Sequence, residues 1–266
     1  MKLNHLLVPV LSMGLAVSAF AGTAGKAPEP IQPPADTTLG ATLTVGYDTN
    51  YIFRGVQFAE NLVSGSLDWV IPFDKTFSLD LNAWYGASAD SSAEPFAGGH
   101  SYGELDLSPT LLAKIPLNND SSITFGLKYT WYHYGMNAEH FIDDVNELGG
   151  LVKYTTNLGP GSLDLGAGAY HDWTADGWYF EYSIDYNFTI IKDRLTIQPG
   201  FLISHASHYY GVDGGNTMKP WLALVINLTK TATLSPYIAG NVPYGSLDDN
   251  GEKSRVYGGI ALSVTF

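Results

Sequence analysis

The sequence predicts an all-β protein, an antiparallel transmembrane β-barrel of about twelve strands. Three observations predict it: apolar and polar residues alternate in one segment after another from Leu39 onward, the segments are each near ten residues long, and short and long connections follow one another in turn. Because the number of strands is even, both termini are expected on the same side, the periplasmic side of the membrane.

Composition agrees with this fold class and excludes others. The chain has 266 residues, 26 acidic against 13 basic side chains, 29 glycines and 13% aromatic residues, which suits a single tyrosine-rich all-β unit. The acidic excess argues against nucleic acid as a partner. The lack of cysteine excludes disulfides and thiolate metal sites. No phosphate-binding, zinc or dinucleotide motif is present, so no cofactor is expected.

The first 38 residues are expected to lie outside the barrel. Lys2, an apolar stretch over residues 6–17 and the Ala19-Phe20-Ala21 site predict a signal peptide over residues 1–21, cleaved after Ala21. Residues 22–38 contain the proline-rich text APEPIQPPAD, which predicts a flexible periplasmic segment. Residues 39–266 are the predicted outer-membrane β-barrel.

The twelve expected strands obey one rule, which is that every second residue is apolar and faces lipid. In chain order the lipid-facing sets are Leu43, Val45, Tyr47, Tyr51 and Phe53; Val63, Leu67, Trp69, Ile71 and Phe73; Phe77, Leu79, Leu81, Ala83 and Tyr85; Leu105, Leu107, Leu111, Ala113 and Ile115; Ile123, Phe125, Leu127, Tyr129 and Trp131; Leu148, Val152 and Tyr154; Leu163, Leu165, Ala167 and Ala169; Trp178, Phe180, Tyr182, Ile184, Tyr186 and Phe188; Leu195, Ile197, Phe201 and Ile203; Leu222, Leu224, Ile226 and Leu228; Leu234 and Ile238; and Val256, Gly258, Ile260, Leu262, Val264 and Phe266.

The connections give an independent check, since outer-membrane barrels have short periplasmic turns and longer outer loops. The even-numbered connections are short: 72–76, 117–121, 157–161, 191–194 and 229–231. The odd-numbered ones include the longer stretches 89–101, 135–144, 209–216 and 242–253, although 58–61 and 175–177 are short. Aromatic residues near strand ends, such as Trp69 and Trp178, resemble interfacial girdles, which disfavours a soluble lipocalin-like barrel with its apolar residues inside.

Two stretches resemble known proteins. The terminal segment RVYGGIALSVTF ends on Phe266 and resembles the C-terminal signature of bacterial outer-membrane barrels, which implies the barrel-assembly machinery as a partner. The text VGYDTNYIFRGV at residues 45–56, followed by SGSLDWVIPF and ELDLSP, resembles the TorF-type porins, the Gcw-chp family of conserved bacterial proteins. That resemblance implies an outer-membrane barrel with channel function, and Arg54 matches the arginine of the family's first-strand motif.

The inward-facing positions carry the charges. A basic residue facing hydrocarbon costs roughly 2 to 4 kcal/mol, so this placement favours a polar lumen. The hypothesis is a water-filled passage whose carboxylates concentrate small polar or cationic solutes. The alternative is a hydrogen-bonded polar plug, and twelve strands lie between the filled eight-stranded barrel and the open sixteen-stranded one. The candidate pore-lining residues are Asp48, Arg54, Asp68, Asp80, Glu104, Asp106, Lys128, Glu181 and Asp185.

An enzymatic alternative rests on His205 and Ser207, which share the lipid face of one expected strand. A His-x-Ser pair there resembles outer-membrane lipid A deacylases, in which the histidine would activate the serine hydroxyl. No outward carboxylate lies on the adjacent strands, and Asn227, the third group of a related phospholipase set, points inward. His133, His171 and His208 lie near outer strand ends on strands about 10 Å apart, so no metal site is expected.

The outer loops carry several carboxylates that could bind divalent cations. Asp143, Asp144, Asp248, Asp249 and Glu252 are candidates for divalent cations bridging lipopolysaccharide, but DDNGE is too short for a calcium loop. The expected partners are therefore outer-membrane lipids, lipopolysaccharide and small polar solutes. A surface adhesin stays open as a third class, although the outer loops are short for that role.

Overall fold

The computed structural model describes residues 39–89, 102–135 and 144–266. The expected signal peptide and proline-rich segment lie outside the described residues, as does Asp143. The described chain forms twelve strands and one helical turn. These are β1 (Ala41–Phe53), β2 (Val56–Pro72), β3 (Phe77–Ser88), β4 (Gly103–Pro116), β5 (Ser121–Tyr134), β6 (Val145–Leu158), β7 (Gly161–Asp172), β8 (Gly177–Ile191), β9 (Leu195–Tyr209), β10 (Val212–Asn227), β11 (Ala232–Pro243), α1 (Ser246–Asp249) and β12 (Arg255–Thr265).

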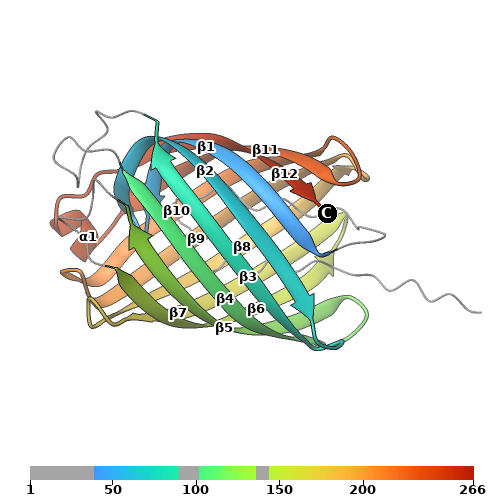
Figure 1. The fold of residues 1–266 in the computed structure, drawn as a ribbon, viewed down its shortest axis with the longest axis horizontal. Coiled ribbons are helices and arrows are strands. Elements are labelled where there is room, and N and C mark those ends of the chain that lie inside the picture. Colours follow the sequence, from blue (N-terminus) through green and yellow to red (C-terminus); the bar gives the residue numbers. More distant parts are fainter. Residues whose placement is uncertain (1–38, 90–101, 136–143) are drawn as a thin grey trace, which may run out of the picture.

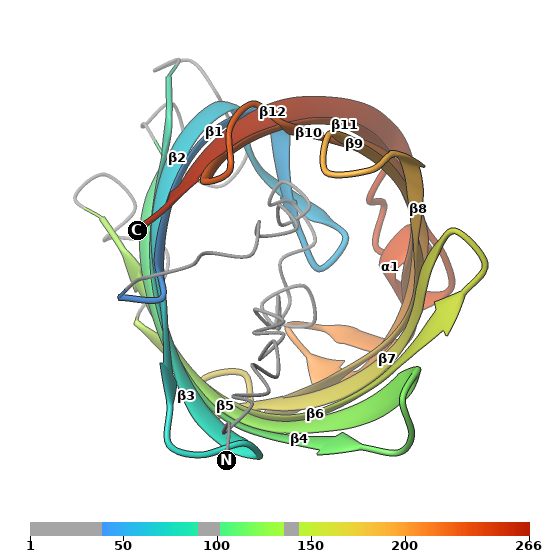
Figure 2. The same ribbon diagram turned by 90° about the vertical axis from the view of Figure 1, so that its right-hand side faces the viewer.

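The strands form a closed antiparallel barrel in which each strand pairs with its neighbours in sequence and β12 pairs with β1 (Figures 1 and 2). The closing seam runs from Thr42↔Thr265 to Asp48↔Gly259. Across it the hydroxyls of Thr44 and Ser263 lie 2.8 Å apart, and the Phe266 amide donates to the Ala41 carbonyl at 2.9 Å. The barrel therefore begins and ends at one end, and the predicted fold class is confirmed.

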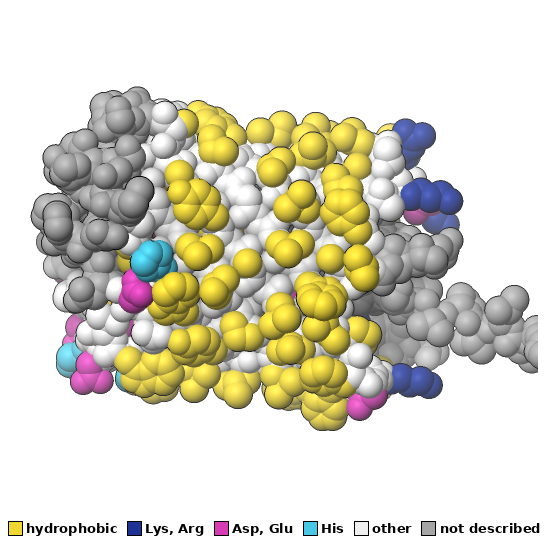
Figure 3. All heavy atoms as spheres, viewed as in Figure 1, with side chains coloured by type: hydrophobic (Ala, Val, Ile, Leu, Met, Phe, Trp, Pro, Cys, Tyr) yellow, Lys and Arg dark blue, Asp and Glu magenta, His cyan; other side chains and the backbone are white. Residues whose placement is uncertain are grey.

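The strands are long enough to cross a membrane obliquely. They range from 11 residues in β12 to 17 in β2, and a tilted spanning strand needs about ten. Apolar side chains are spread over the side of the barrel that Figure 3 shows, and apolar strand residues are exposed all round it, for example Val256 at 75%, Leu127 at 54% and Ile238 at 54%. No helix in the described part of the chain is long and apolar enough to span a membrane.

The two ends of the barrel differ as expected. The end that holds the seam residues Ala41 and Phe266 carries the short turns, and we call it the turn end. The β2–β3 turn is typical: Asp74 Oδ1 accepts the backbone amides of Phe77 and Thr76 at 2.8 and 2.7 Å, and these bonds lower the pKa of Asp74. The opposite end, here the loop end, carries the longer connections and α1 (Figure 1).

The first hairpin departs from the prediction. Tyr51 and Phe53 were expected to face lipid, but they are 0% and 8% exposed, and the connection is Arg54–Gly55 instead of residues 58–61. A register shift between Tyr51 and Ile52 breaks the alternation, which is the mark of a β-bulge. Beyond it the β1–β2 hairpin leaves the wall and lies inside the ring of strands, drawn in blue in Figure 2.

Candidate functional site

The tip of the β1–β2 hairpin is a two-residue turn, Arg54–Gly55, in which both residues have left-handed backbone conformations. Arg54 and Gly55 both have positive φ, 49° and 87°, as a type I′ turn requires. Gly55 also has no room for a side chain, because a Cβ there would lie 2.5 Å from Leu247 of α1. The turn therefore presents Arg54 to the lumen with little freedom.

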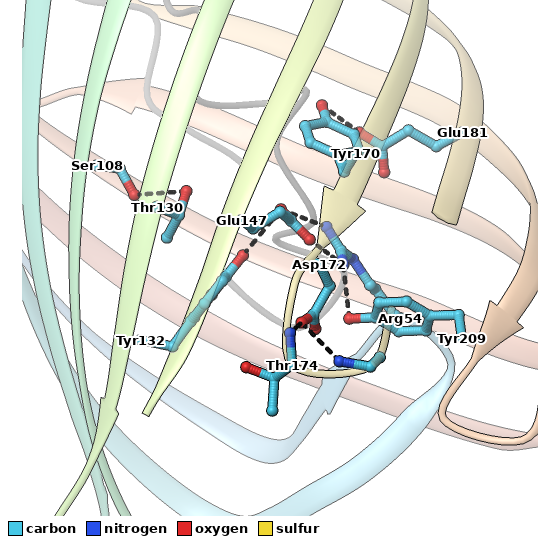
Figure 4. Close-up of polar contacts among 11 residues, drawn as sticks. Arg54, Ser108, Thr130, Tyr132, Glu147, Tyr170, Asp172, Thr174, Glu181 and Tyr209 are labelled. Carbon is cyan, nitrogen blue, oxygen red and sulfur yellow. Dashed lines mark hydrogen bonds and ion pairs between the residues drawn. The ribbon is translucent and has the colours of Figure 1, made fainter. Parts of the chain in front are cut away.

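Arg54 reaches across the lumen to the far wall (Figure 4). Its Nη2 donates to Glu147 Oε1 at 2.8 Å, its Nη1 donates to Glu147 Oε2, and Nη1 also donates to the Tyr209 hydroxyl at 2.6 Å. Glu147 lies on β6, which is almost halfway round the ring from β1. Arginine and carboxylate thus form a bidentate, charge-assisted pair, with side chains only 2% and 3% exposed.

Aromatic rings surround the same guanidinium. Its Cζ lies 4.3 Å from the ring centroid of Tyr179, 5.1 Å from that of Tyr209 and 5.2 Å from that of Tyr170, all within cation–π range. Phe53 of the hairpin itself adds a fourth ring at 5.0 Å. We call Glu147, Tyr170, Tyr179 and Tyr209 the Arg54 cage; they come from the four consecutive strands β6 to β9.

Other contacts hold the hairpin on both sides of its tip. The Tyr51 hydroxyl donates to Glu104 Oε2 at 2.9 Å, and Tyr102 donates to the same oxygen at 2.5 Å. On the opposite side, Asn241 Nδ2 donates to the Gly55 carbonyl at 2.8 Å. The hairpin is therefore anchored to β4, β6, β9 and β11 and narrows the lumen at the loop end.

The nine predicted pore-lining residues all point into the barrel. Arg54 meets the far wall, Glu104 accepts from Tyr51, and Asp68 accepts from Asn82 Nδ2 at 2.5 Å and from Ser66 Oγ at 3.1 Å. Asp48 accepts the Tyr237 hydroxyl, and Glu181 accepts the Tyr170 hydroxyl at 3.1 Å. Asp68 is partly buried; the other eight, at most 9% exposed, are Asp48, Arg54, Asp80, Glu104, Asp106, Lys128, Glu181 and Asp185.

The Arg54 cage was not found from the sequence. Alternation places Glu147 on the inner face, but nothing in the local sequence pairs it with a residue 93 positions away. Tyr170 and Tyr179 also follow from alternation, since their neighbours His171 and Trp178 were expected to face lipid. Their shared contact with Arg54 depends on the inward fold of the hairpin, for which the residues gave no signal.

The His205–Ser207 pair of the enzymatic alternative is not the serine–histidine contact that the structure shows. His205 is exposed and Ser207 partly exposed, yet Ser207 Oγ lies 3.2 Å from His208 Nδ1. Asn227 accepts from Thr233 Oγ1 at 3.2 Å instead of approaching the serine. Ser207, His205 and Asn227 are therefore not joined as the nucleophile, base and orienting group that acyl hydrolysis needs.

His133 and His171 each lie near one carboxylate. His133 Nδ1 is 2.8 Å from Asp144 Oδ1, and His171 Nε2 is 3.7 Å from Asp176 Oδ1. Among residues 39–89, 102–135 and 144–266 no three histidine or carboxylate side chains cluster as metal ligands would. Of the loop carboxylates, Glu252 lies 3.7 Å from Arg255 Nε.

Comparison with known proteins extends the description of the fold. In sequence the chain matches no protein-family model and no curated protein, so the TorF-type resemblance stays a prediction. In structure it resembles an outer membrane channel from Pseudomonas putida F1, with a TM-score of 0.60 and 14% identity over 88% of this chain and 99% of that chain.

Two porins show the same likeness. The NanC porin gives a TM-score of 0.56 with 11% sequence identity, and the match covers 85% of this chain and 100% of the NanC chain. The KdgM porin in complex with disordered oligogalacturonate gives 0.51 at 12% identity, over 85% and 99%. With its apolar outer face, the chain is thus a closed twelve-stranded barrel of the outer-membrane kind, and its fold is the one these porins and channels have.

Proposed function

We propose that the protein is an outer-membrane channel that passes small polar or cationic solutes through an acidic lumen. The observation that carries the proposal is the excess of inward carboxylates. In the described residues the buried charges comprise eight acids (Asp48, Asp80, Glu104, Asp106, Glu147, Asp172, Glu181 and Asp185) against three bases (Arg54, Lys128 and Lys153). The porin and channel neighbours support a channel as the general class.

The sign of the lumen's charge narrows the solute class. A passage lined by one sign of charge raises the local concentration of counter-ions and excludes ions of like charge. Oligogalacturonate, the ligand of the KdgM complex, is a chain of carboxylate sugars. An acidic lumen would repel such a chain, so we expect a different solute class here.

The proposed orientation follows from the two ends. Outer-membrane barrels keep short turns in the periplasm and longer loops outside, so the turn end would face the periplasm and the hairpin would narrow the outer mouth. Phe266 would then be available to the barrel-assembly machinery, and the loop end would meet lipopolysaccharide. The narrowed mouth leads us to expect a small unitary conductance.

The test is the reversal potential of the purified barrel in a planar bilayer with a potassium chloride gradient. We expect cation preference, reduced in a doubly neutralised Asp80→Asn/Asp185→Asn variant because both carboxylates are buried inside. The matched control is Asp176→Asn, whose side chain is 96% exposed outside the lumen and whose loss should leave selectivity unchanged. Anion preference would overturn the proposed solute class, and a silent bilayer for every variant would overturn the channel.

A further inference from the structure

We propose that the Arg54 cage is a binding site for guanidinium-type organic cations, and that Arg54 occupies it as a built-in surrogate for the solute. The inference rests on the proposed channel function for its biological setting. It names both a site on the lumen wall and the chemical class of ligand. The hairpin then acts as a tethered occupant that a free cation would have to replace.

The cage and its occupant come from separate parts of the fold. Glu147, Tyr170, Tyr179 and Tyr209 lie on β6 to β9, whereas Arg54 arrives from the β1–β2 hairpin on the other side of the lumen. Withdrawal of the hairpin would remove the guanidinium and Phe53 but leave the carboxylate and three tyrosine rings on the wall. The site is therefore complete in the wall alone.

The wall positions the cage without help from Arg54. Tyr170 donates to Glu181 at 3.1 Å and Tyr132 donates to Glu147 Oε1 at 3.3 Å (Figure 4). The rings of Tyr170 and Tyr179 pack with centroids 6.4 Å apart, and those of Tyr179 and Tyr209 with centroids 5.9 Å apart. These contacts hold Glu147 Oε1 and the ring faces in place, so the cage is largely preorganised for a ligand.

A purely structural ion pair explains this arrangement less well. A buried pair recovers little more than the cost of removing two charges from water, so it is weak evidence for stabilisation by itself. Here the cation also receives three aromatic faces and a tyrosine hydroxyl from the wall, the set of contacts that recognises a ligand cation.

The geometry selects among cations. A guanidinium is planar and offers parallel N–H groups to both carboxylate oxygens while its faces stack on rings, as Arg54 does here. An ammonium is a compact, strongly hydrated point charge that cannot form the fork. We therefore expect guanidinium and arginine-like solutes to bind better than ammonium, and potassium to bind least.

Chemical rescue tests the site. Arg54→Ala removes the occupant from the full-length barrel, and millimolar guanidinium chloride, far below denaturing levels, should raise its unfolding midpoint in detergent by about 3 °C or more. Sodium chloride and urea at equal concentration should not. The double variant Arg54→Ala/Glu147→Gln lacks the fork acceptor and should show no rise. If Arg54→Ala does not fold unaided, guanidinium should restore its folded yield on a heat-modifiability gel.

The outcomes separate this inference from the channel proposal. No rescue by guanidinium, or equal rescue of single and double variants, would overturn the binding site even if the barrel conducts cations selectively. Rescue that depends on Glu147 would support the site even if the bilayer were silent, because unfolding and folding yield do not require conduction.

Discussion

At the scale of single residues, the contact between Arg54 and Glu147 joins the tip of the β1–β2 hairpin to the opposite wall of the barrel. Both side chains are almost fully buried, and the guanidinium makes two bonds to the carboxylate. Its Nε makes no hydrogen bond to any residue of the described part. The pair is therefore bidentate, although the guanidinium is not fully hydrogen-bonded within the described residues.

Replacement of Glu147 by glutamine should leave a buried arginine without its counter-charge. Breaking one side of a buried pair typically costs 3–5 kcal/mol, and the surviving amide oxygen leads us to expect about 3 kcal/mol. Urea unfolding in micelles measures it. Asp176→Asn, at an exposed carboxylate, is the control and should change stability by less than about 0.5 kcal/mol. Equal stability of the Glu147→Gln and native barrels would show that the pair contributes nothing.

Sequence reasoning worked for side-chain direction at this scale and failed for partners. Alternation alone directed Asp48, Glu104 and Glu181 inward, because a strand in a lipid-facing wall has only two faces. The partner of Arg54 could not be predicted, since the contact joins residues 93 positions apart across the barrel interior. No local pattern encodes which inward groups meet across a lumen.

At the scale of elements, the β1–β2 hairpin is the part that behaves unlike a wall strand. Tyr51 and Phe53 were predicted on the lipid face because the alternation of β1 was extended to its end. The bulge after Tyr51 breaks that alternation. Beyond it the hairpin turns inward and forms hydrogen bonds to Glu104 and Asn241 instead of facing lipid. Periodicity cannot detect a strand that leaves the sheet.

Alanine at Gly55 should loosen this hairpin. The new Cβ would meet Leu247 at 2.5 Å in a backbone with φ of 87°, and such strain costs on the order of 1–3 kcal/mol. Trypsin cleavage after Arg54, a residue 2% exposed in the native barrel, should accelerate about tenfold.

The control for Gly55→Ala is Gly211→Ala. Gly211 has a similar φ of 80° in a two-residue connection, but a Cβ there would have no neighbour within 4 Å. It should not change cleavage at Arg54. If both variants are cleaved at the native rate, the contact with Leu247 does not hold the hairpin.

At the scale of the whole molecule, closure of the barrel depends on the seam between β1 and β12. The hydroxyls of Thr42 and Thr265 lie 3.1 Å apart there, and the seam ends at the bond between Phe266 and Ala41. Strand number and alternation were predictable from sequence, as were the short turns, but the connection expected over 209–216 is only Tyr210–Gly211, because β9 and β10 extend to the tip of their hairpin. The predictable features follow from hydrocarbon thickness and the need to leave no strand edge in lipid.

Replacement of Phe266 by alanine should reduce assembly more than stability. The ring is 51% exposed on the outer face, so its loss removes little packing from the finished barrel. If Phe266 is read by the assembly machinery, the yield of folded barrel in cells should fall several-fold while the thermal midpoint of purified barrel changes by at most a few degrees. Val256→Ala, at a 75% exposed site on the same strand, is the control. Equal yields of folded barrel from Phe266→Ala and native chains would show that the assembly machinery does not recognise Phe266.

The inward hairpin also has a consequence for the order of events in folding. Its anchors join Arg54 to residues 93 and 155 positions later, and Gly55 to one 186 positions later. The hairpin can therefore dock only after strands far along the chain have taken their places, and contacts between such distant residues form slowly. A newly closed barrel should pass through a brief stage with an undocked hairpin and a wider mouth, and docking of the hairpin should be the last step of maturation.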